Sequence, residues 1–407
     1  MKGLAMYKKL FRGVRKLAPF LAAAPVFLFF NVVLIAQSDS TRVRKVGSSS
    51  SPTVTSSPIA QDQNPPPPKT KPKPTPSPQN PIDSGDDEVV RVNSNLVVVP
   101  VSVTDAAGNP VQNLKASDFR LQEAGKEQEI ARVGDPEQVP LDIAILFDLS
   151  SSVSSRFAFQ QQAASRFLKE VLRPSDTATV YAIDKTPRLV QAKGPVDSAI
   201  NTLLSFHAAT EATPTAFYDT VTAAAKYLAE NAPKEHRRVI LVISDGDDNF
   251  STGIRDAEIS NYQNSHGDGT VKNPADMTRG ETRTALNELH RRSQQEVQKN
   301  VQRADTVFYS INPSGESIRL NVVSTRAENG MKVIADATGG TAFVPNTDQD
   351  LEKVFRQIAA ELHAQYLLQY YSSDESPTGK FIPIKVTLPS NAQYGVRARQ
   401  GYYAKKR

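Results

Sequence analysis

Residues 140–155 read PLDIAILFDLSSSVSS, and this stretch decides the fold. Between residues 141 and 147 every position is apolar except Asp142. Such a run is typical of a strand that is buried on both faces of a parallel sheet. We therefore predict a central strand here, with the rest of the chain built around it.

Oxygen-bearing side chains follow this strand. Ligands of open α/β sheets bind at the carboxyl ends of the strands, which is where Asp148, Ser150 and Ser152 begin. A carboxylate and two hydroxyls, without Cys or His, suit a hard cation such as Mg²⁺ or Ca²⁺ rather than Zn²⁺. The alternative is that Asp148 and the serines cap a helix expected over roughly residues 156–172.

Two further stretches favour the cation. Residues 237–244, RRVILVIS, form a second apolar strand pattern that ends in Asp245. A loop that contains Thr215 opens a helix expected to continue to about Asn231. Three loops would then offer oxygen ligands at one edge of the sheet.

This spacing resembles the metal-ion-dependent adhesion site of von Willebrand factor type A (VWFA) domains. The family pattern is Asp-x-Ser-x-Ser, then a Thr before a helix, then Asp-Gly after the fourth strand. Its five positions are filled here by Asp148, Ser150, Ser152, Thr215 and Asp245. Pro214 departs from the pattern, because the family usually has Gly there. The segment before the domain, VPVSVTDAAGNPVQNLKASDFRLQEAGKEQEI, is similar to the VWFA-related family described from acidobacteria.

The resemblance implies a protein-binding module and not an enzyme. In the family Ser150, Ser152 and Thr215 would contact the metal, while Asp148 and Asp245 would act through water. The cation would be Mg²⁺, with Mn²⁺ or Ca²⁺ as alternatives, and a partner protein would complete its coordination with an Asp or Glu carboxylate.

Strand and helix patterns alternate through residues 139–363, which predicts an α/β, doubly wound, mostly parallel six-stranded sheet with helices on both faces. The last helix is expected to be capped by Asp348 and to end near His363. Residues 88–138 and 364–407 are β-rich flanks, with strands expected over residues 91–103, 127–133, 365–371, 381–388 and 396–403. Each flank has too few strands for a stable sheet of its own. We expect the flanks to form one small β-sandwich, in which residues 95–103 share a sheet with strands from residues 381–403.

The chain has 407 residues, no cysteine and a basic N-terminus. Residues 1–37 combine that basic stretch with an apolar run, Leu17 to Ala36, which is typical of a secretory signal or a membrane anchor. Residues 38–87 are rich in Pro, Ser and Thr and are expected to be a disordered linker. We therefore expect an exported protein, periplasmic, cell-surface or secreted, with an N-terminal tether if the signal is kept.

The net charge of +5 does not indicate nucleic-acid binding. Residues 1–86 hold twelve Lys or Arg against four Asp or Glu, so the remainder carries about −3. No basic face for phosphate is expected.

Two alternatives stay open within the VWFA-like region. A polar, Gly-rich insertion near residues 251–280 emerges beside Asp245 and would either contact a ligand or form a surface excursion. Asp247 and Asp248 would either hold a second cation or cap their own loop.

Other functions are a metal-dependent hydrolase or a structural domain whose site is unused. Metals with an open position can activate water, but no Gly-x-Ser-x-Gly elbow is present. The histidines lack a metal or nucleophile spacing and are His207, His236, His266, His290 and His363.

Overall fold

The computed structural model describes residues 95–256, 279–316, 322–374 and 376–404. The predicted signal or anchor, the predicted linker and most of the insertion near residues 251–280 lie outside the described residues. Within the described ranges, no helix combines the length and the apolar character needed to cross a membrane.

The centre of the α/β part is a six-stranded sheet in the order β10-β9-β8-β5-β6-β7. All neighbouring pairs are parallel except β6 and β7, which are antiparallel. The strands are β5 (Leu141–Asp148), β6 (Thr177–Ile183), β7 (Arg188–Gly194), β8 (Arg237–Ile243), β9 (Thr306–Ile311) and β10 (Ala342–Phe343). The predicted fold class is confirmed.

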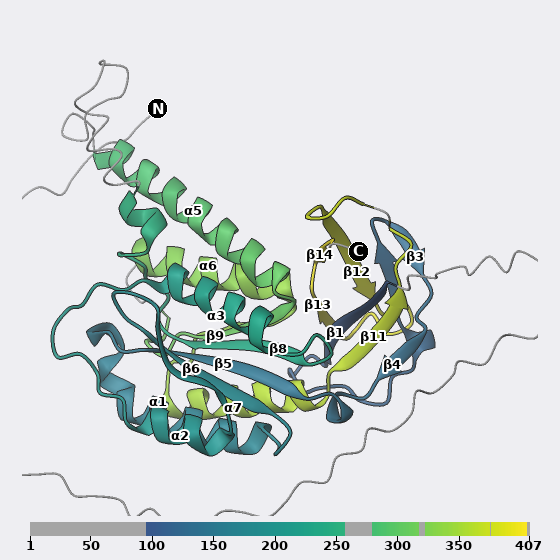
Figure 1. The fold of residues 1–407 in the computed structure, drawn as a ribbon, viewed down its shortest axis with the longest axis horizontal. Coiled ribbons are helices and arrows are strands. Elements are labelled where there is room, and N and C mark those ends of the chain that lie inside the picture. Colours follow the sequence, from purple (N-terminus) through teal and green to yellow (C-terminus); the bar gives the residue numbers. More distant parts are fainter. Residues whose placement is uncertain (1–94, 257–278, 317–321, 375, 405–407) are drawn as a thin grey trace, which may run out of the picture. The chain divides into compact units, whose positions relative to one another are not determined.

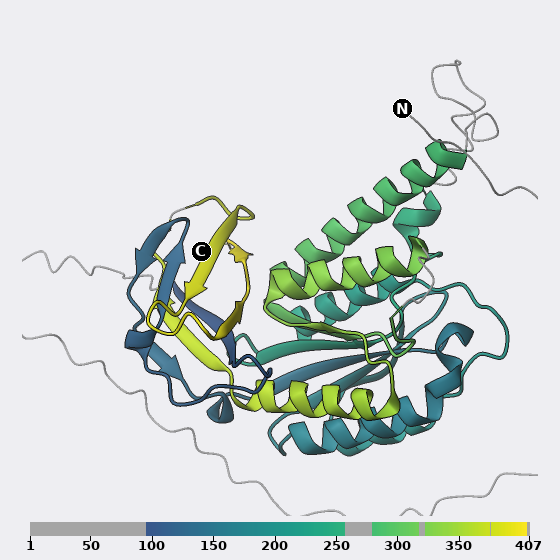
Figure 2. The same ribbon diagram turned by 180° about the vertical axis from the view of Figure 1, so that it is seen from behind.

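Helices cover both faces of this sheet (Figures 1 and 2). One face packs against α1, α2 and α7, and the other against α3, α5 and α6. Their bounds are α1 (Phe157–Val171), α2 (Val196–Leu204), α3 (Phe217–Asn231), α5 (Arg279–Arg303), α6 (Val322–Thr338) and α7 (Asp348–His363). Each face therefore has its own apolar core.

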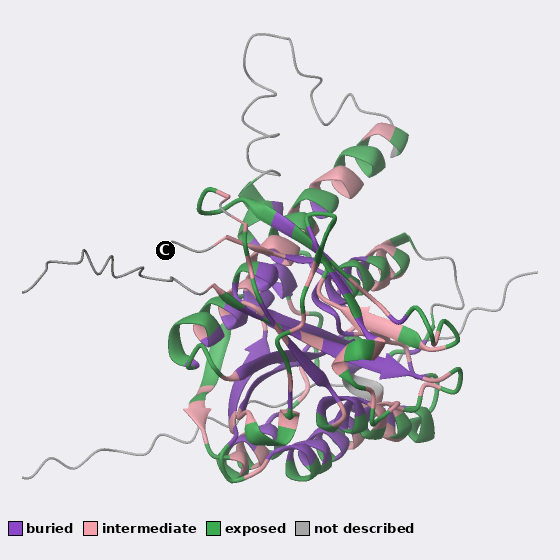
Figure 3. Cartoon of the chain, turned by 90° about the vertical axis from the view of Figure 1, so that its right-hand side faces the viewer, coloured by how far each residue is buried: buried purple, intermediate pink, exposed green. Residues whose placement is uncertain are grey.

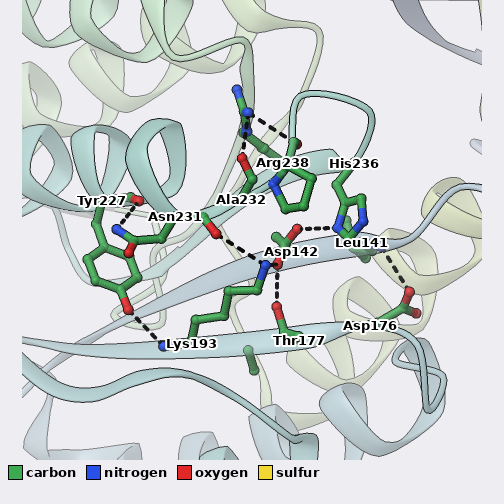
Figure 4. A network of polar contacts seen from close by, with 12 residues as sticks. Leu141, Asp142, Asp176, Thr177, Lys193, Tyr227, Asn231, Ala232, His236 and Arg238 are labelled. Carbon is green, nitrogen blue, oxygen red and sulfur yellow. Dashed lines mark hydrogen bonds and ion pairs between the residues drawn. The ribbon is translucent and has the colours of Figure 1, made fainter. Parts of the chain in front are cut away.

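Strand β5 lies between β8 and β6, as its apolar sequence predicts. All eight of its residues are buried, and the central strands form the buried interior seen in Figure 3. Its one early charge, Asp142, accepts hydrogen bonds from His236 Nδ1 (2.7 Å) and the Thr177 hydroxyl, and it pairs with Lys193 Nζ at 2.8 Å (Figure 4). The buried carboxylate is thus neutralised by groups from three other segments, and it fastens the strand to them.

Two buried arginines at the start of β8 cap helices. Arg238 donates to the carbonyls of Ala304, Ala232 and Pro233, at the C-terminal ends of α5 and α3. Arg237 donates to the Leu362 carbonyl in the last turn of α7, at 2.7 Å. The last carbonyls of a helix lack intrahelical partners and carry partial negative charge, so a cation stabilises them. These helix ends explain how adjacent arginines are buried.

The two flanks fold together into a β-sandwich. Strands β13-β1-β11-β4 form one sheet and β14-β12-β2-β3 the other. Their bounds are β1 (Leu96–Thr104), β2 (Arg120–Glu123), β3 (Lys126–Gln128), β4 (Arg132–Gly134), β11 (Tyr366–Tyr371), β12 (Phe381–Thr387), β13 (Gly395–Ala398) and β14 (Gly401–Tyr403). Because β1 pairs with β13, the expected sharing between residues 95–103 and 381–403 is observed.

Polar contacts inside and beside the sandwich join its parts. The buried Glu123 carboxylate accepts hydrogen bonds from the hydroxyls of Tyr370 (2.6 Å) and Tyr402 (2.8 Å). Arg399 and Asp305, which directly precedes β9, form an ion pair at 2.8 Å. The sandwich is therefore fastened both internally and to the α/β part.

Three local predictions were wrong. The strand expected over residues 127–133 is two strands, β3 and β4, which belong to different sheets. The strand expected over residues 396–403 is likewise split into β13 and β14. The expected cap of the last helix, Asp348, is its first residue; Thr347 is the cap and accepts a hydrogen bond from the Asp350 N–H.

Candidate metal centre

Asp148 ends β5 and is fully buried. Its Oδ1 accepts the backbone N–H of Ser150 at 2.8 Å, and its Oδ2 accepts the hydroxyl of Ser244 at 2.6 Å. These bonds fix both carboxylate oxygens. Asp148 therefore belongs to the interior, and its replacement by Ala would leave the Ser150 N–H and the Ser244 hydroxyl without their acceptor.

The two serines lie in the turn that follows. The hydroxyl oxygens of Ser150 and Ser152 are 2.9 Å apart. Residues 151–156 form a 3₁₀ turn before α1, and Arg156 at the N-cap of α1 makes no side-chain capping bond. Among the described side chains, none of this cluster donates to or accepts from the first turn of α1, so the capping alternative is not observed there.

The second strand end brings Asp245 to the same region. Ser244 precedes it and accepts the N–H of Gly246 at 2.9 Å while donating to Asp148. Gly246 has φ +77, and a Cβ there would lie 2.7 Å from the Met331 Cε atom. The positive φ favours glycine here, because any other residue would be strained, and this accounts for the Asp-Gly pair.

Thr215 is buried just before α3. Its N–H donates to Asn249 Oδ1 at 2.7 Å, and its carbonyl accepts the N–H groups of Asn249 and Phe250, both at 3.1 Å. Thr215 is thus bound to the loop that begins with Asp245. Within the described ranges no hydrogen bond joins Thr215 directly to the other four predicted site residues.

The electrostatics of the site suit a cation. Burial, with the nearby Asp245 carboxylate second, raises the pKa of Asp148 to about 6, against the hydrogen bonds from Ser244 and Ser150, which lower it. Neither Asp148 nor Asp245 forms an ion pair with any described Lys, Arg or His side chain. Two nearby carboxylates that repel each other and have no basic partner are stabilised when a cation binds near both.

The donor set fits a hard cation. Two carboxylates and hydroxyl oxygens are the ligand types that Mg²⁺ and Ca²⁺ prefer. The part of the chain that the structure describes contains no metal-sized group of three or more His, Cys, Asp or Glu side chains. A site here would therefore depend on neutral oxygens, as the sequence predicts.

The two neighbouring aspartates have other roles. Asp248 accepts the N–H groups of Tyr218, Phe250 and Ser251. Asp247 is partly exposed and lies 3.8 Å from Arg326. Asp248 therefore follows the capping alternative. Of the predicted insertion, residues 252–256 are helical up to the last described position.

Sequence reasoning missed Ser244 and Asn249. Ser244 directly precedes the Asp-Gly pair, so its place at the same strand end was a usable signal. Asn249 contacts a residue 34 positions away, at a spacing that follows no secondary-structure period.

The sequence matches no family model and no curated protein. The structure is similar to the PilB minor pilin of Streptococcus sanguinis, with 11% identity, 56% of this chain and 62% of that chain covered, and a TM-score of 0.37. It is similar to the vWF domain of the type V pili tip protein Mfa5 from Porphyromonas gingivalis, with 14% identity, 54% of this chain and 94% of that chain covered, and a TM-score of 0.34. It is also similar to proximal thread matrix protein 1 of the mussel byssus, a structure in which that protein's MIDAS motif is occupied by zinc. The identity is 11%, the match covers 58% of this chain and 48% of that chain, and the TM-score is 0.37.

The topology of this chain itself determines its fold class. Six strands, one antiparallel at the edge, with helices on both faces, agree with the plan that the sequence predicts. The fold is VWFA-like. Asp148, Ser150 and Asp245 of this VWFA-like domain lie at the carboxyl edge of its sheet, where α/β folds bind ligands.

Proposed function

We propose that this protein is an exported, divalent-metal-dependent protein-binding module of the VWFA-related kind described from acidobacteria. The metal would be held by Asp148, Ser150, Ser152, Thr215 and Asp245. Mg²⁺ is the first candidate, with Mn²⁺ and Ca²⁺ as alternatives. The observation that carries the proposal is the fully buried Asp148 beside Asp245, without a basic partner among the described residues.

The donor set also determines what the cation could do. When bound, a divalent ion at this site supplies a positive centre that attracts an acidic group. The three direct donors would be the neutral hydroxyls of Ser150, Ser152 and Thr215, with Asp148 and Asp245 acting through water. The first coordination shell would therefore leave the ion its positive charge. An Asp or Glu carboxylate of a partner protein would then be a favourable additional ligand.

Export is part of the proposal and rests on the sequence of residues 1–37. Whether Leu17 to Ala36 is removed or kept as a tether decides between a secreted and an anchored protein. Sequencing the mature N-terminus of the protein in its own cells separates the two. Finding the full-length chain in the cytosolic fraction would contradict export.

Calorimetric titration with Mg²⁺ tests the metal site, with Asp148→Asn as the variant. Asn keeps the size of the side chain and one acceptor oxygen, whereas Ala would leave two donors unpaired at a cost of about 1–3 kcal/mol each. Wild type should bind Mg²⁺, more tightly when an acidic peptide is added, and Asp148→Asn should lose binding.

Asp184→Asn is the matched control. Asp184 follows β6 at the same edge of the sheet, but its carboxylate bonds the N–H of Lys185 and lies 3.7 Å from Arg188. This variant should bind Mg²⁺ as wild type does. If wild type binds no divalent ion, the structural-domain alternative replaces the proposal; if it binds metal and hydrolyses an ester or phosphate, the hydrolase alternative does.

A further inference from the structure

The first turn of α3 is capped by a different loop. Ala216 occupies the N-cap position and has no side chain that could bond the exposed N–H groups. Instead the N–H of Tyr218 donates to Asp248 Oδ2 at 2.7 Å, and the N–H of Asp219 donates to Ser251 Oγ at 3.0 Å. The caps that helices usually take from their own N-terminal residue are thus supplied from about 30 positions further along the chain.

The same loop holds Thr215 on both sides of its backbone. The Asn249 side chain accepts the Thr215 N–H, and the Thr215 carbonyl accepts the N–H groups of Asn249 and Phe250. These bonds and the distant caps join the start of α3 to residues 248–251. Asp245 lies three residues before this segment, so Thr215 is hydrogen-bonded to the same loop that carries Asp245.

We propose that Asn249 is a positioning residue that sets the metal affinity of the site by fixing Thr215, with Asp248 holding the helix start on which Thr215 depends. This inference rests on the proposed function. Asn249 itself is solvent-exposed and is not one of the proposed ligands. Its carboxamide Oδ1 bonds the backbone of a proposed ligand, so its removal would let that ligand move without removing a donor from the site.

A purely structural role for Asn249 makes a different prediction. A bond that serves only the stability of the loop would change the melting temperature and leave the affinity for metal unchanged. Because Asn249 is exposed, its replacement should lower the melting temperature by only about 2–4 °C. Groups that orient metal ligands, in contrast, typically change metal affinity by about 10–100-fold when they are lost.

The test uses Mn²⁺ as the probe, because its paramagnetism reports both binding and the symmetry of the site. The affinity of the full chain for Mn²⁺ is measured by electron paramagnetic resonance for wild type, Asn249→Ala and Asn249→Asp. Asn249→Ala should raise the Kd for Mn²⁺ about 10–100-fold. Asn249→Asp keeps an acceptor oxygen at the same place and should recover most of the affinity.

Asn231→Ala is the matched control. Asn231 is an exposed asparagine at the other end of α3, and its side chain also bonds a backbone group, the Tyr227 carbonyl, at 2.8 Å. It should bind Mn²⁺ as wild type does. In metal-free protein, hydrogen exchange at the Thr215 amide should be faster in Asn249→Ala than in either wild type or Asn231→Ala.

The outcomes separate this inference from the proposed function. If wild type binds Mn²⁺ and Asn249→Ala binds equally well, the positioning role is overturned while the metal site stands. The melting temperature of Asn249→Ala is also measured in the presence of a chelator. If the variant loses affinity for Mn²⁺ only because this melting temperature collapses, the positioning role is overturned as well. If wild type binds no Mn²⁺, both proposals fall.

Discussion

At the scale of single residues, buried His290 should make stability depend on pH. Its Nδ1 lies 3.1 Å from the Tyr218 hydroxyl, and burial, with the Arg326 charge second, lowers its pKa to about 4. An unfolded histidine binds its proton near pH 6.5, so between pH 6.5 and 4 the unfolded chain binds more protons and the free energy of unfolding falls as pH falls.

The expected loss from this group is about 3 kcal/mol across that window. It is measured by denaturant unfolding from pH 7 to pH 4.5. His290→Asn should lose less stability on acidification than wild type. Tyr218→Phe, which leaves the histidine buried, should keep the wild-type dependence; equal curves for wild type and His290→Asn would contradict the prediction.

The position of a residue could be predicted from the sequence where the end of a strand determines it. Asp148 and Asp245 follow apolar runs, so their presence at the carboxyl edge could be predicted. The burial of Asp148 and its hydrogen bond from Ser244, which follows β8, could not be predicted, because they depend on how distant segments pack. The role of Asp248 depends on a helix start 30 positions earlier in the chain.

At the scale of elements, Arg238 should contribute strongly to stability through the helix ends that it caps. Arg238→Met keeps an unbranched apolar side chain but leaves the carbonyls of Ala304, Ala232 and Pro233 without this donor. Buried groups left unpaired cost about 1–3 kcal/mol each, so we expect a loss of about 3 kcal/mol or more in the free energy of unfolding. Urea denaturation measures it.

Arg292→Met is the control for this prediction. Arg292 lies on the exposed side of α5 and pairs with Glu288 at 3.0 Å. Exposed ion pairs of this kind contribute about 0.3–0.5 kcal/mol. A loss as small for Arg238→Met as for Arg292→Met would show that the helix ends do not need the buried guanidinium.

Helices and strands could be predicted where one hydrophobic pattern runs through the whole element and the element packs in one place. The central strands and α3 lie within one or two residues of their expected bounds because their apolar periodicity is unbroken. The errors fall where the chain leaves one sheet for the other, between β3 and β4 and between β13 and β14. Residues on both sides of these breaks have similar β-forming character, so propensity alone shows no boundary.

At the scale of the whole molecule, the first flank should need the second in order to fold. A chain ending at residue 363 lacks β11 and β13, the two neighbours of β1, and β12, a neighbour of β2. Residues 95–138 should therefore be cleaved rapidly in limited proteolysis. A chain ending at residue 404 should keep them protected, and equal protection in both chains would show that the first flank folds without its partner.

The register between β1 and β11 determines how the molecule would bear a mechanical load. The six pairs run antiparallel from Leu96 opposite Tyr371 to Val101 opposite Tyr366, and Tyr366 is the end that follows the VWFA-like domain. If the N-terminal side were held and a bound partner pulled on the domain, β1 and β11 would be drawn in opposite directions along their own axes. Their hydrogen bonds would then share the force and break together in shear, whereas an unzipping geometry would break them one at a time. Tension between the tether and the partner would thus load the β-sandwich in the direction in which it resists force better.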